Sequence, residues 1–229
     1  MYRWAKRTFD VVLSLLGLII SIPLWIAAVI GIEISDPGPV FYMAQRIGRD
    51  NKPFRMFKFR SMRVDDKADE KNFKAAGSRI FPFGEVMRRY KIDELPQLIN
   101  IILGDMSIVG PRPAARDQLD IVRGGRFSRT AEVPPGLTGP GALLDYIYGD
   151  AVESEEEYIE KVLSLRLELE LYYIDARGPL YDLKMIWYTV VCIFCRVIGR
   201  EPERAIRELR GCAEDRNQTK TEKTAAENI

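Results

Sequence analysis

The stretch that decides how this chain folds runs from Ile92 to Pro113 and reads IDELPQLINIILGDMSIVGPRP. After Pro96, apolar side chains recur at helical spacing, and Gly104 stands where a glycine commonly follows the end of a helix. The sequence therefore predicts a buried helix that ends near Leu103. Beyond it, a stiff loop holds Arg112 between two prolines.

Two adjacent carboxylates, Asp93 and Glu94, precede this helix. Asp93 has the position of an N-cap, and Pro96 is tolerated because amides of the first turn have no partner within the helix. The partial positive charge of a helix N-terminus also keeps carboxylates ionised and attracts anions. From this local pattern a simple cap is the favoured interpretation of Asp93, because capping acids far outnumber catalytic ones.

The composition limits the chemistry that this chain can use. It has 229 residues, a formal net charge of +1, three cysteines and no histidine. One domain with a tail is the natural expectation, and no global charge points to nucleic acid. Without histidine, catalysis must use carboxylates, Lys, Arg, Tyr, Ser or a hard metal held by oxygen. The lone Cys192-x-x-Cys195 pair predicts reduced, packed thiols rather than a zinc site, and the odd count fits a reducing compartment.

The segment from Val11 to Ile32 contains no charged residue. Its length of about 22 residues, at ~1.5 Å per residue, is enough to cross a hydrocarbon core of ~30 Å. It is longer than the apolar region of a typical signal peptide. Pro23 is expected to bend this helix, and the Ser21 hydroxyl can serve the backbone groups that Pro23 leaves unpaired. Basic residues flank both ends, so a spanning and a re-entrant helix remain equally open; they are Arg3, Lys6, Arg7, Arg46, Arg49 and Lys52.

Short strands are expected at Val40–Tyr42 and Phe54–Met62. Their alternation places Lys58 and Arg60 on one face, where they could rest on anionic lipid headgroups or face a diphosphate. Nucleic-acid binding would use similar cations, but no recognised module accompanies them. The polar segment Val64–Arg79 is expected to be an exposed helix or loop.

Four further segments complete the expected architecture. A short helix over Phe83–Tyr90 would deliver Arg88, Arg89 and Lys91 beside Asp93 and hold that carboxylate ionised, with weaker claims for Arg89 and Lys91. The pattern also predicts an amphipathic helix over Ala114–Arg129, with Leu119 and Ile121 inward. A long helix is expected over Glu153–Tyr173, an interfacial helix over Leu180–Ile198, and a mobile polar tail over Glu201–Ile229.

Taken together, the motifs Asp93–Leu98, Gly104–Ser107 and Val109–Pro113, with Lys58–Met62 upstream, resemble the bacterial sugar transferase family. The resemblance covers roughly residues 1 to 195. It implies a monotopic phosphoglycosyl transferase of mostly α structure with a small antiparallel β element, an α+β fold. The expected parts are a re-entrant membrane anchor built as helix, break and helix (1–36), a catalytic domain with interfacial helices (37–200) and the polar tail (201–229).

The resemblance also implies a reaction and a site. Asp93 would be the nucleophile that receives a sugar phosphate from a nucleotide diphosphate sugar, and Glu94 would bind or position Mg²⁺. Arg88 and Arg112 would hold phosphate oxygens. The expected partners are a UDP-sugar donor, a polyprenyl phosphate acceptor, membrane lipid and, in some assemblies, a second copy of the chain, with no nucleic acid. The expected location is the cytoplasmic face of the inner membrane, at the first membrane step of surface glycan assembly.

The chain departs from the family pattern at a few positions. Ile22 stands where the family often has Ser before the proline, and Pro134 replaces an arginine that usually precedes Pro-Gly. Asp145 and Tyr146 lie where a Gly-Arg pair often follows, which questions the nucleotide or sugar contacts of this region. Asp182 matches an acidic position of the family but also fits a helix cap.

Two other functions stay open at this point. A non-catalytic membrane-associated protein would explain the anchor and the cations, although not the two motifs around Asp93 and Arg112. A conventional glycosyltransferase would release a nucleoside diphosphate, whereas the reaction implied above releases a nucleoside monophosphate. The sequence does not identify the sugar.

Overall fold

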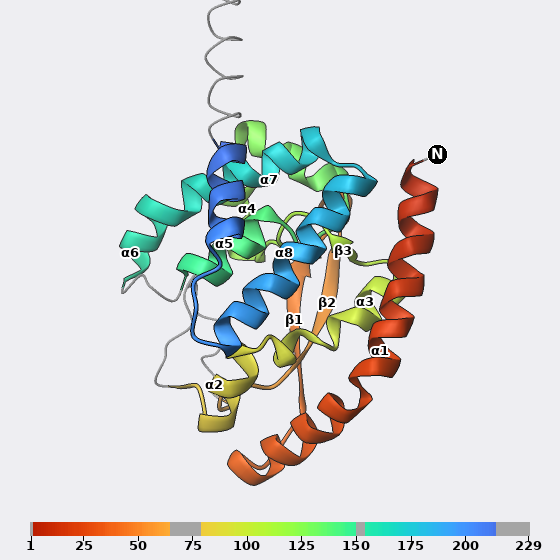
Figure 1. Ribbon diagram of the computed structural model, residues 1–229, viewed down its shortest axis with the longest axis vertical. Coiled ribbons are helices and arrows are strands. Elements are labelled where there is room, and N and C mark those ends of the chain that lie inside the picture. The colour runs from red at the N-terminus through yellow and green to blue at the C-terminus, as the bar shows by residue number, and fades with distance from the viewer. Residues whose placement is uncertain (1, 65–78, 150–153, 214–229) are drawn as a thin grey trace, which may run out of the picture.

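The computed structural model describes residues 2–64, 79–149 and 154–213, and in these ranges it is mostly helical with two small two-stranded sheets (Figure 1). The helices are α1 (Tyr2–Ser35), α2 (Pro82–Arg89), α3 (Gln97–Leu103), α4 (Leu119–Val122), α5 (Pro140–Tyr148), α6 (Glu155–Tyr158), α7 (Ser164–Ala176) and α8 (Pro179–Val197). The strands are β1 (Phe41–Ile47), β2 (Pro53–Phe59), β3 (Ser107–Val109) and β4 (Gly136–Thr138). The predicted α+β class is confirmed at this level. Most of the segment Val64–Arg79 lies outside the described residues.

Helix α1 is long and apolar enough to cross a membrane, by length and composition. It bends below its middle, so its second half turns beneath the rest of the molecule (Figure 1). Pro23 lies inside the helix and cannot donate a backbone hydrogen bond. The Ser21 hydroxyl donates to the Leu18 carbonyl at 3.2 Å and accepts from Trp25 Nε1 at 3.1 Å. The helix bends, as the sequence predicted, and it continues through Pro23, whereas the family resemblance implied a break there.

The hairpin β1–β2 pairs from Phe41 opposite Phe59 to Ile47 opposite Pro53. Helix α3 is fixed to it by Asn100, whose side chain is fully buried. The Asn100 amide donates to the Arg55 carbonyl at 2.7 Å, and Asn100 Oδ1 accepts from the Phe57 amide at 2.9 Å. One polar side chain thus joins the helix that follows Asp93 to the strand that carries Lys58.

The second sheet is a parallel pair, β3 with β4, which the sequence did not predict. Its strands lead into the Arg112 loop and the loop before α5. The two backbones touch at Gly110 and Gly136: a Cβ on Gly110 would lie 2.6 Å from the Pro134 carbonyl oxygen, and one on Gly136 would lie 2.2 Å from the Gly110 nitrogen. Glycine is therefore required at both positions by close backbone approach.

Two hydrophobic clusters hold the elements together. The smaller one joins the second half of α1 to β2 and α2 through Ala28, Ile32, Phe59, Phe81 and Met87. The larger one includes residues of α3, α5, α7 and α8. All three cysteines are without disulfides, as predicted.

The predicted helix over residues 114–129 is wrong. One α-helical turn, α4, lies between 3₁₀ turns, and Gly125 adopts a positive φ of 54°. Glycines at 124 and 125 interrupt the helix because they favour other backbone conformations. Val122 is buried and Leu119 packs against the larger cluster, as predicted for Leu119, whereas Ile121 is half exposed.

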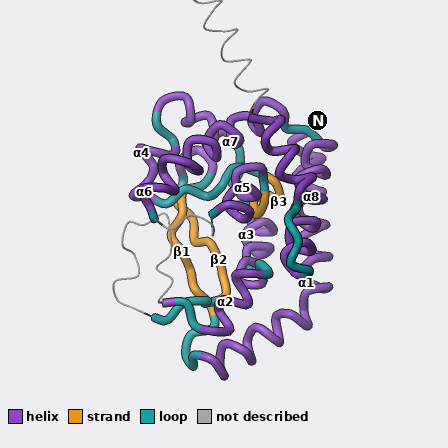
Figure 2. Tube along the Cα trace, turned by 60° about the vertical axis from the view of Figure 1, so that its left-hand side comes forward, coloured by secondary structure: helices purple, strands orange, loops and turns teal. Residues whose placement is uncertain are grey.

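Helix α8 confirms the predicted helix over residues 180–198 and leaves one apolar face exposed. Figure 2 shows α8 on the same side of the molecule as α1, with the β1–β2 hairpin on the other. The exposed face, called the α8 stripe below, consists of Leu180, Leu183, Trp187, Val190, Phe194 and Val197.

The chain after α8 differs from the predicted mobile tail. Residues 203–213 form a helix. Its buried side chains, Ala205, Leu209 and Cys212, recur at helical spacing and join the larger cluster. Residues 214–229 lie outside the described part of the chain.

Candidate active site

Asp93 lies in a 3₁₀ turn, Ile92–Glu94, and α3 begins only after Pro96, which is its N-cap. The prediction that Asp93 is an N-cap is therefore wrong, because this turn separates the carboxylate from the first turn of α3. The Asp93 side chain is 4% exposed, and its Oδ1 is buried with no hydrogen-bond partner. A buried unpaired carboxylate oxygen is costly for folding, so a structural role does not explain it.

Two lysines hold the neighbouring Glu94. Lys58 Nζ lies 3.0 Å and Lys91 Nζ 3.4 Å from the same oxygen, Glu94 Oε1. Lys91 adopts a left-handed conformation with φ 59°, which is uncommon for a residue other than glycine. Its ammonium group also lies 5.1 Å from the centre of the Tyr146 ring.

The two carboxylates respond differently to this environment. Burial raises the pKa of Asp93, and the lowering effect of Lys58 and the other cations does not outweigh it. The nearby cations thus lower the pKa of Asp93 as expected, but burial is the larger effect. Burial alone would also raise the pKa of Glu94, but Lys58, Lys91 and Arg112 outweigh it and lower that pKa well below its usual range.

Arg88 and Arg112 both belong to this cluster. Arg88, near the end of α2, is one of the cations that lower the pKa of Asp93. Arg112 lowers the pKa of Glu94, and the Nη1 of Arg112 lies 3.4 Å from Asp145 Oδ2. Its side chain is 40% exposed, so an anion from solution can reach it.

Arg60 makes different contacts from Lys58. It follows the last residue of β2, and its buried guanidinium pairs with Asp36 and donates to the Pro39 carbonyl. These contacts fix the end of α1 to the hairpin. Binding of a donor by Arg60 stays a prediction.

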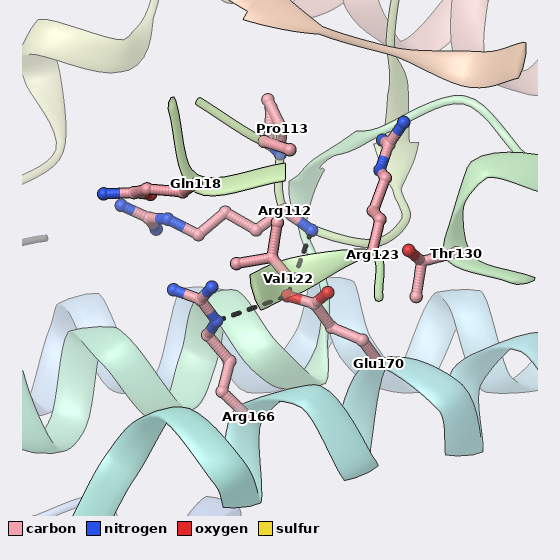
Figure 3. Close-up of a pocket in the computed structure, with 9 residues that line it drawn as sticks. Arg112, Pro113, Gln118, Val122, Arg123, Thr130, Arg166 and Glu170 are labelled. Carbon is pink, nitrogen blue, oxygen red and sulfur yellow. Dashed lines mark hydrogen bonds and ion pairs between the residues drawn. The ribbon is translucent and has the colours of Figure 1, made fainter. Parts of the chain in front are cut away.

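Arg112 also lines a small cavity, together with Arg166 and Glu170 (Figure 3). The guanidinium groups of Arg112 and Arg166 point to the same side of it, while Arg123 points away. Glu170 is fully buried beneath them, and its Oε1 lies 3.6 Å from Arg166 Nε. Arg166 also donates to the Tyr158 hydroxyl at 2.7 Å, so Arg112 is backed by a buried ionic network.

Helix α1 holds both ends of the 92–113 stretch. Arg7 donates to the carbonyls of Ile101 and Ile102, the latter at 2.8 Å, and so satisfies the end of α3. The buried Asp10 accepts from the Ser107 hydroxyl at 2.7 Å and from the Ile108 amide at 3.2 Å. The anchor and the candidate site are therefore joined directly.

Asp182 also connects α1 to the rest of the molecule. It lies in the first turn of α8, after the N-cap Gly178. Its Oδ2 accepts from the Tyr2 hydroxyl and from Lys6 Nζ, both at 2.8 Å. Asp182 therefore binds α1 and does not cap its own helix.

Sequence reasoning gave too little weight to Lys91 and did not identify Asp145 as the partner of Arg112. The three-residue separation of Lys91 from Glu94 was a usable signal, because such pairs meet on a helical turn. No signal existed for Asp145, since its pairing depends on the packing of α5 and α7.

Comparison with known proteins places the chain in a family by its sequence. The family model described as bacterial sugar transferase matches residues 1–196. The chain is 34% identical over 194 residues to the UDP-glucose:undecaprenyl-phosphate glucose-1-phosphate transferase of Escherichia coli, covering 82% of this chain and 40% of that protein.

Two further relatives differ in how much of their length is matched. The UDP-N-acetylgalactosamine-undecaprenyl-phosphate N-acetylgalactosaminephosphotransferase of Aeromonas hydrophila is 30% identical over 200 residues, 83% of this chain and 44% of that protein. The exopolysaccharide production protein ExoY of Sinorhizobium fredii is 33% identical over 211 residues, 82% of this chain and 86% of that protein. The chain thus spans about two fifths of the length of the first two.

Proposed function

Because this chain belongs to the bacterial sugar transferase family, we propose that it is a phosphoglycosyl transferase that moves a sugar 1-phosphate from a UDP-sugar to an undecaprenyl-type phosphate. The products are a polyprenyl diphosphate sugar and uridine monophosphate. The names of its relatives support the classes of donor and acceptor, and they differ in the sugar. The reaction would be a first membrane step in the assembly of a surface glycan.

The proposal rests on the surroundings of the Asp93 carboxylate. Its buried Oδ1 has no hydrogen-bond partner, although three cations, Lys58, Lys91 and Arg88, act on its charge. Such an oxygen is available to form a bond to phosphorus, and the cations can balance the charge of an incoming diphosphate.

The proposed reaction has two displacements. An Asp93 oxygen attacks the phosphorus nearest the sugar, and the bond to the nucleoside monophosphate breaks. The resulting aspartyl phosphosugar is then attacked by an oxygen of the lipid phosphate, which restores the Asp93 carboxylate. Lys58, Arg88 and Arg112 would bind phosphate oxygens in both steps.

The donor must open the site first, because Asp93 is buried and Lys58 and Lys91 are paired with Glu94. A phosphate can exchange with Glu94 for these ammonium groups. Water that enters with the donor also removes part of the desolvation that raises the pKa of Asp93. Access and ionisation of the nucleophile are therefore linked.

Mg²⁺ is the proposed cofactor. Among the described residues, no group of three acidic or other metal-binding side chains comes together. Mg²⁺ commonly uses one or two protein carboxylates and completes its shell with water and substrate phosphate, so Glu94 beside the unpaired Asp93 oxygen fits it. When bound, the ion would neutralise charge on the diphosphate.

The contacts of α1 support a re-entrant anchor. Arg7 and Asp10, near its start, bind the 92–113 stretch, and Asp36, just beyond its end, pairs with Arg60. Between them Ala28 and Ile32 pack against the same body. In a spanning helix the two ends of α1 would lie on opposite sides of ~30 Å of hydrocarbon, and the body could contact only one of them. Because both ends of α1 contact the same body, the contacts favour a helix that enters and leaves by one face of the membrane. The proposed face is the cytoplasmic side of the inner membrane.

The proposal is tested by trapping the covalent intermediate. The purified full chain is incubated with Mg²⁺ and UDP-sugars labelled in the sugar, and the protein is analysed by intact mass. The wild type should gain one sugar phosphate and release uridine monophosphate. Asp93→Asn should do neither, with turnover lowered by at least ~10³-fold because the nucleophile is lost.

Asp117→Asn is the matched control, because Asp117 is an exposed acid that is not among the groups acting on the pKa of Asp93 or Glu94. It should behave as the wild type. Retained turnover in Asp93→Asn would remove Asp93 as nucleophile. Release of uridine diphosphate would indicate a conventional glycosyltransferase, and no nucleotide release with any donor would favour a non-catalytic membrane protein.

A further inference from the structure

A second cavity lies far along the chain from the Asp93 cluster, where the helix over residues 203–213 packs beside α7 and α8. Its volume is about 470 Å³, and none of its lining residues belongs to the proposed active site. The residues that the argument uses are Lys184 and Tyr188 of α8, and Arg204, Arg207 and Glu208 of the last helix. This helix lies beyond residue 196, where the match to the family model ends.

The cavity carries more positive than negative charge. Lys184 is paired with Glu208, and this ion pair joins α8 to the last helix. Arg204 and Arg207 are exposed, and no ion pair with a carboxylate in the described part of the chain involves either of them. With one acid balanced by Lys184, two guanidinium groups stay available to an anion.

The cavity also borders the α8 stripe. Lys184 and Tyr188 directly follow Leu183 and Trp187, two members of the stripe, along the helix. An exposed apolar face of this length on an amphipathic helix is suited to the membrane interface. Cations and a tyrosine beside such a face lie at the depth of lipid headgroups.

We infer that this cavity binds the phosphate of an anionic membrane lipid through Arg204 and Arg207, while the acyl chains of that lipid lie along the α8 stripe. A lipid matches both the charge and the adjoining apolar face, whereas a soluble phosphate matches the charge alone. The inference requires membrane association but does not depend on the proposed chemistry at Asp93.

The test measures lipid retained by the purified full chain with native mass spectrometry, from neutral detergent doped with phosphatidylglycerol or phosphatidylcholine. The variant Arg204→Gln/Arg207→Gln removes the two cations of the cavity. The control Arg200→Gln/Arg210→Gln removes two exposed arginines from the same region that do not line it. Sn-glycerol 3-phosphate serves as the soluble competitor.

The wild type should retain phosphatidylglycerol in preference to phosphatidylcholine. The cavity variant should bind it roughly tenfold more weakly, since each basic residue contributes separately near an anionic surface, and the control should bind as the wild type. Millimolar glycerol 3-phosphate should not displace the lipid. Equal weakening in both variants, or no preference for phosphatidylglycerol, would overturn the inference.

Displacement by glycerol 3-phosphate would assign the cavity to soluble anions and would also overturn it. Thermal unfolding of both double variants identifies any loss of folding. Release of uridine monophosphate, measured in the same samples, reports on the proposed reaction independently, so failure of one proposal is distinguishable from failure of the other.

Discussion

The sequence predicted that Arg60 and Arg112 both bind the nucleotide sugar, yet the surroundings of the two side chains differ. Arg60 is buried and bonded to Asp36 and to the Pro39 carbonyl, whereas the Arg112 side chain is 40% exposed and pairs with one carboxylate at 3.4 Å. A buried guanidinium with several acceptors supports the fold, while an exposed one can exchange its partner for a substrate phosphate.

Arg112→Met should therefore lower kcat/KM by ~100-fold with little change in thermal unfolding, because it removes one charged donor from the reacting phosphates. Arg60→Met should destabilise the protein by about 2 kcal/mol or more, because it leaves buried acceptors unpaired. Steady-state kinetics and thermal unfolding of the two purified variants make the comparison. Loss of activity in Arg60→Met without loss of stability would instead assign Arg60 to the donor.

For single residues, the sequence predicted which side chains lie in the candidate site but not which contacts they make. Five predicted residues lie in one cluster: Lys58, Arg88, Asp93, Glu94 and Arg112. They could be predicted because the motifs that contain them are specific. The role of Arg60 in fixing the end of α1 depends on the position of Asp36, twenty-four residues away along the chain. Periodicity carries no information about such a contact.

Among the elements, α1 and α3 have an interaction that matters for the site. Arg7 donates to the last carbonyls of α3, which would otherwise lie at a helix end without partners. Because α3 directly follows the turn that holds Asp93, the position of this helix sets the position of Asp93.

Arg7→Met should destabilise the protein by about 1–3 kcal/mol, because two carbonyl oxygens lose a charged donor. For a chain of this size the loss corresponds to a fall of roughly 3–10 °C in the unfolding temperature. Arg3→Met, which removes an exposed arginine one turn earlier in α1, is the control and should unfold as the wild type. Equal unfolding temperatures for the two variants would show that the contacts of Arg7 do not hold α3.

Elements with strong periodicity were predicted well, and those with weak or interrupted periodicity were not. Helices α2, α3 and α8 follow apolar patterns that begin or end at Pro or Gly. Strand β1 extends to Ile47, whereas the sequence predicted a strand that ends at Tyr42. The helix over 203–213 was missed because only small or isolated apolar side chains, such as Ala205 and Leu209, pack inward among many charges. The parallel pair β3–β4 was missed because strands of three residues leave no readable alternation.

For the whole molecule, the contacts at both ends of α1 lead to a prediction about membrane topology. Cysteines introduced by Arg3→Cys and Pro37→Cys lie in exposed positions at opposite ends of α1. In a re-entrant anchor, both should react with a membrane-impermeant maleimide in inside-out vesicles and neither in intact cells, above the background of the native chain.

Asp117→Cys, in an exposed position of the body that α1 packs against, reports the side of the membrane on which that body lies. All three positions should label alike. If Arg3→Cys and Pro37→Cys label from opposite sides, α1 spans the membrane and the re-entrant proposal fails.

The contact between Gly110 and Gly136 also limits how this chain could be redesigned. With no room for a side chain at either glycine, the segment around Arg112 and the segment after Pro134 form one mechanical unit. A chimera that imports only one of them from a relative would bring together backbones shaped for different neighbours. Attempts to change the sugar used in the proposed reaction should therefore exchange both segments together.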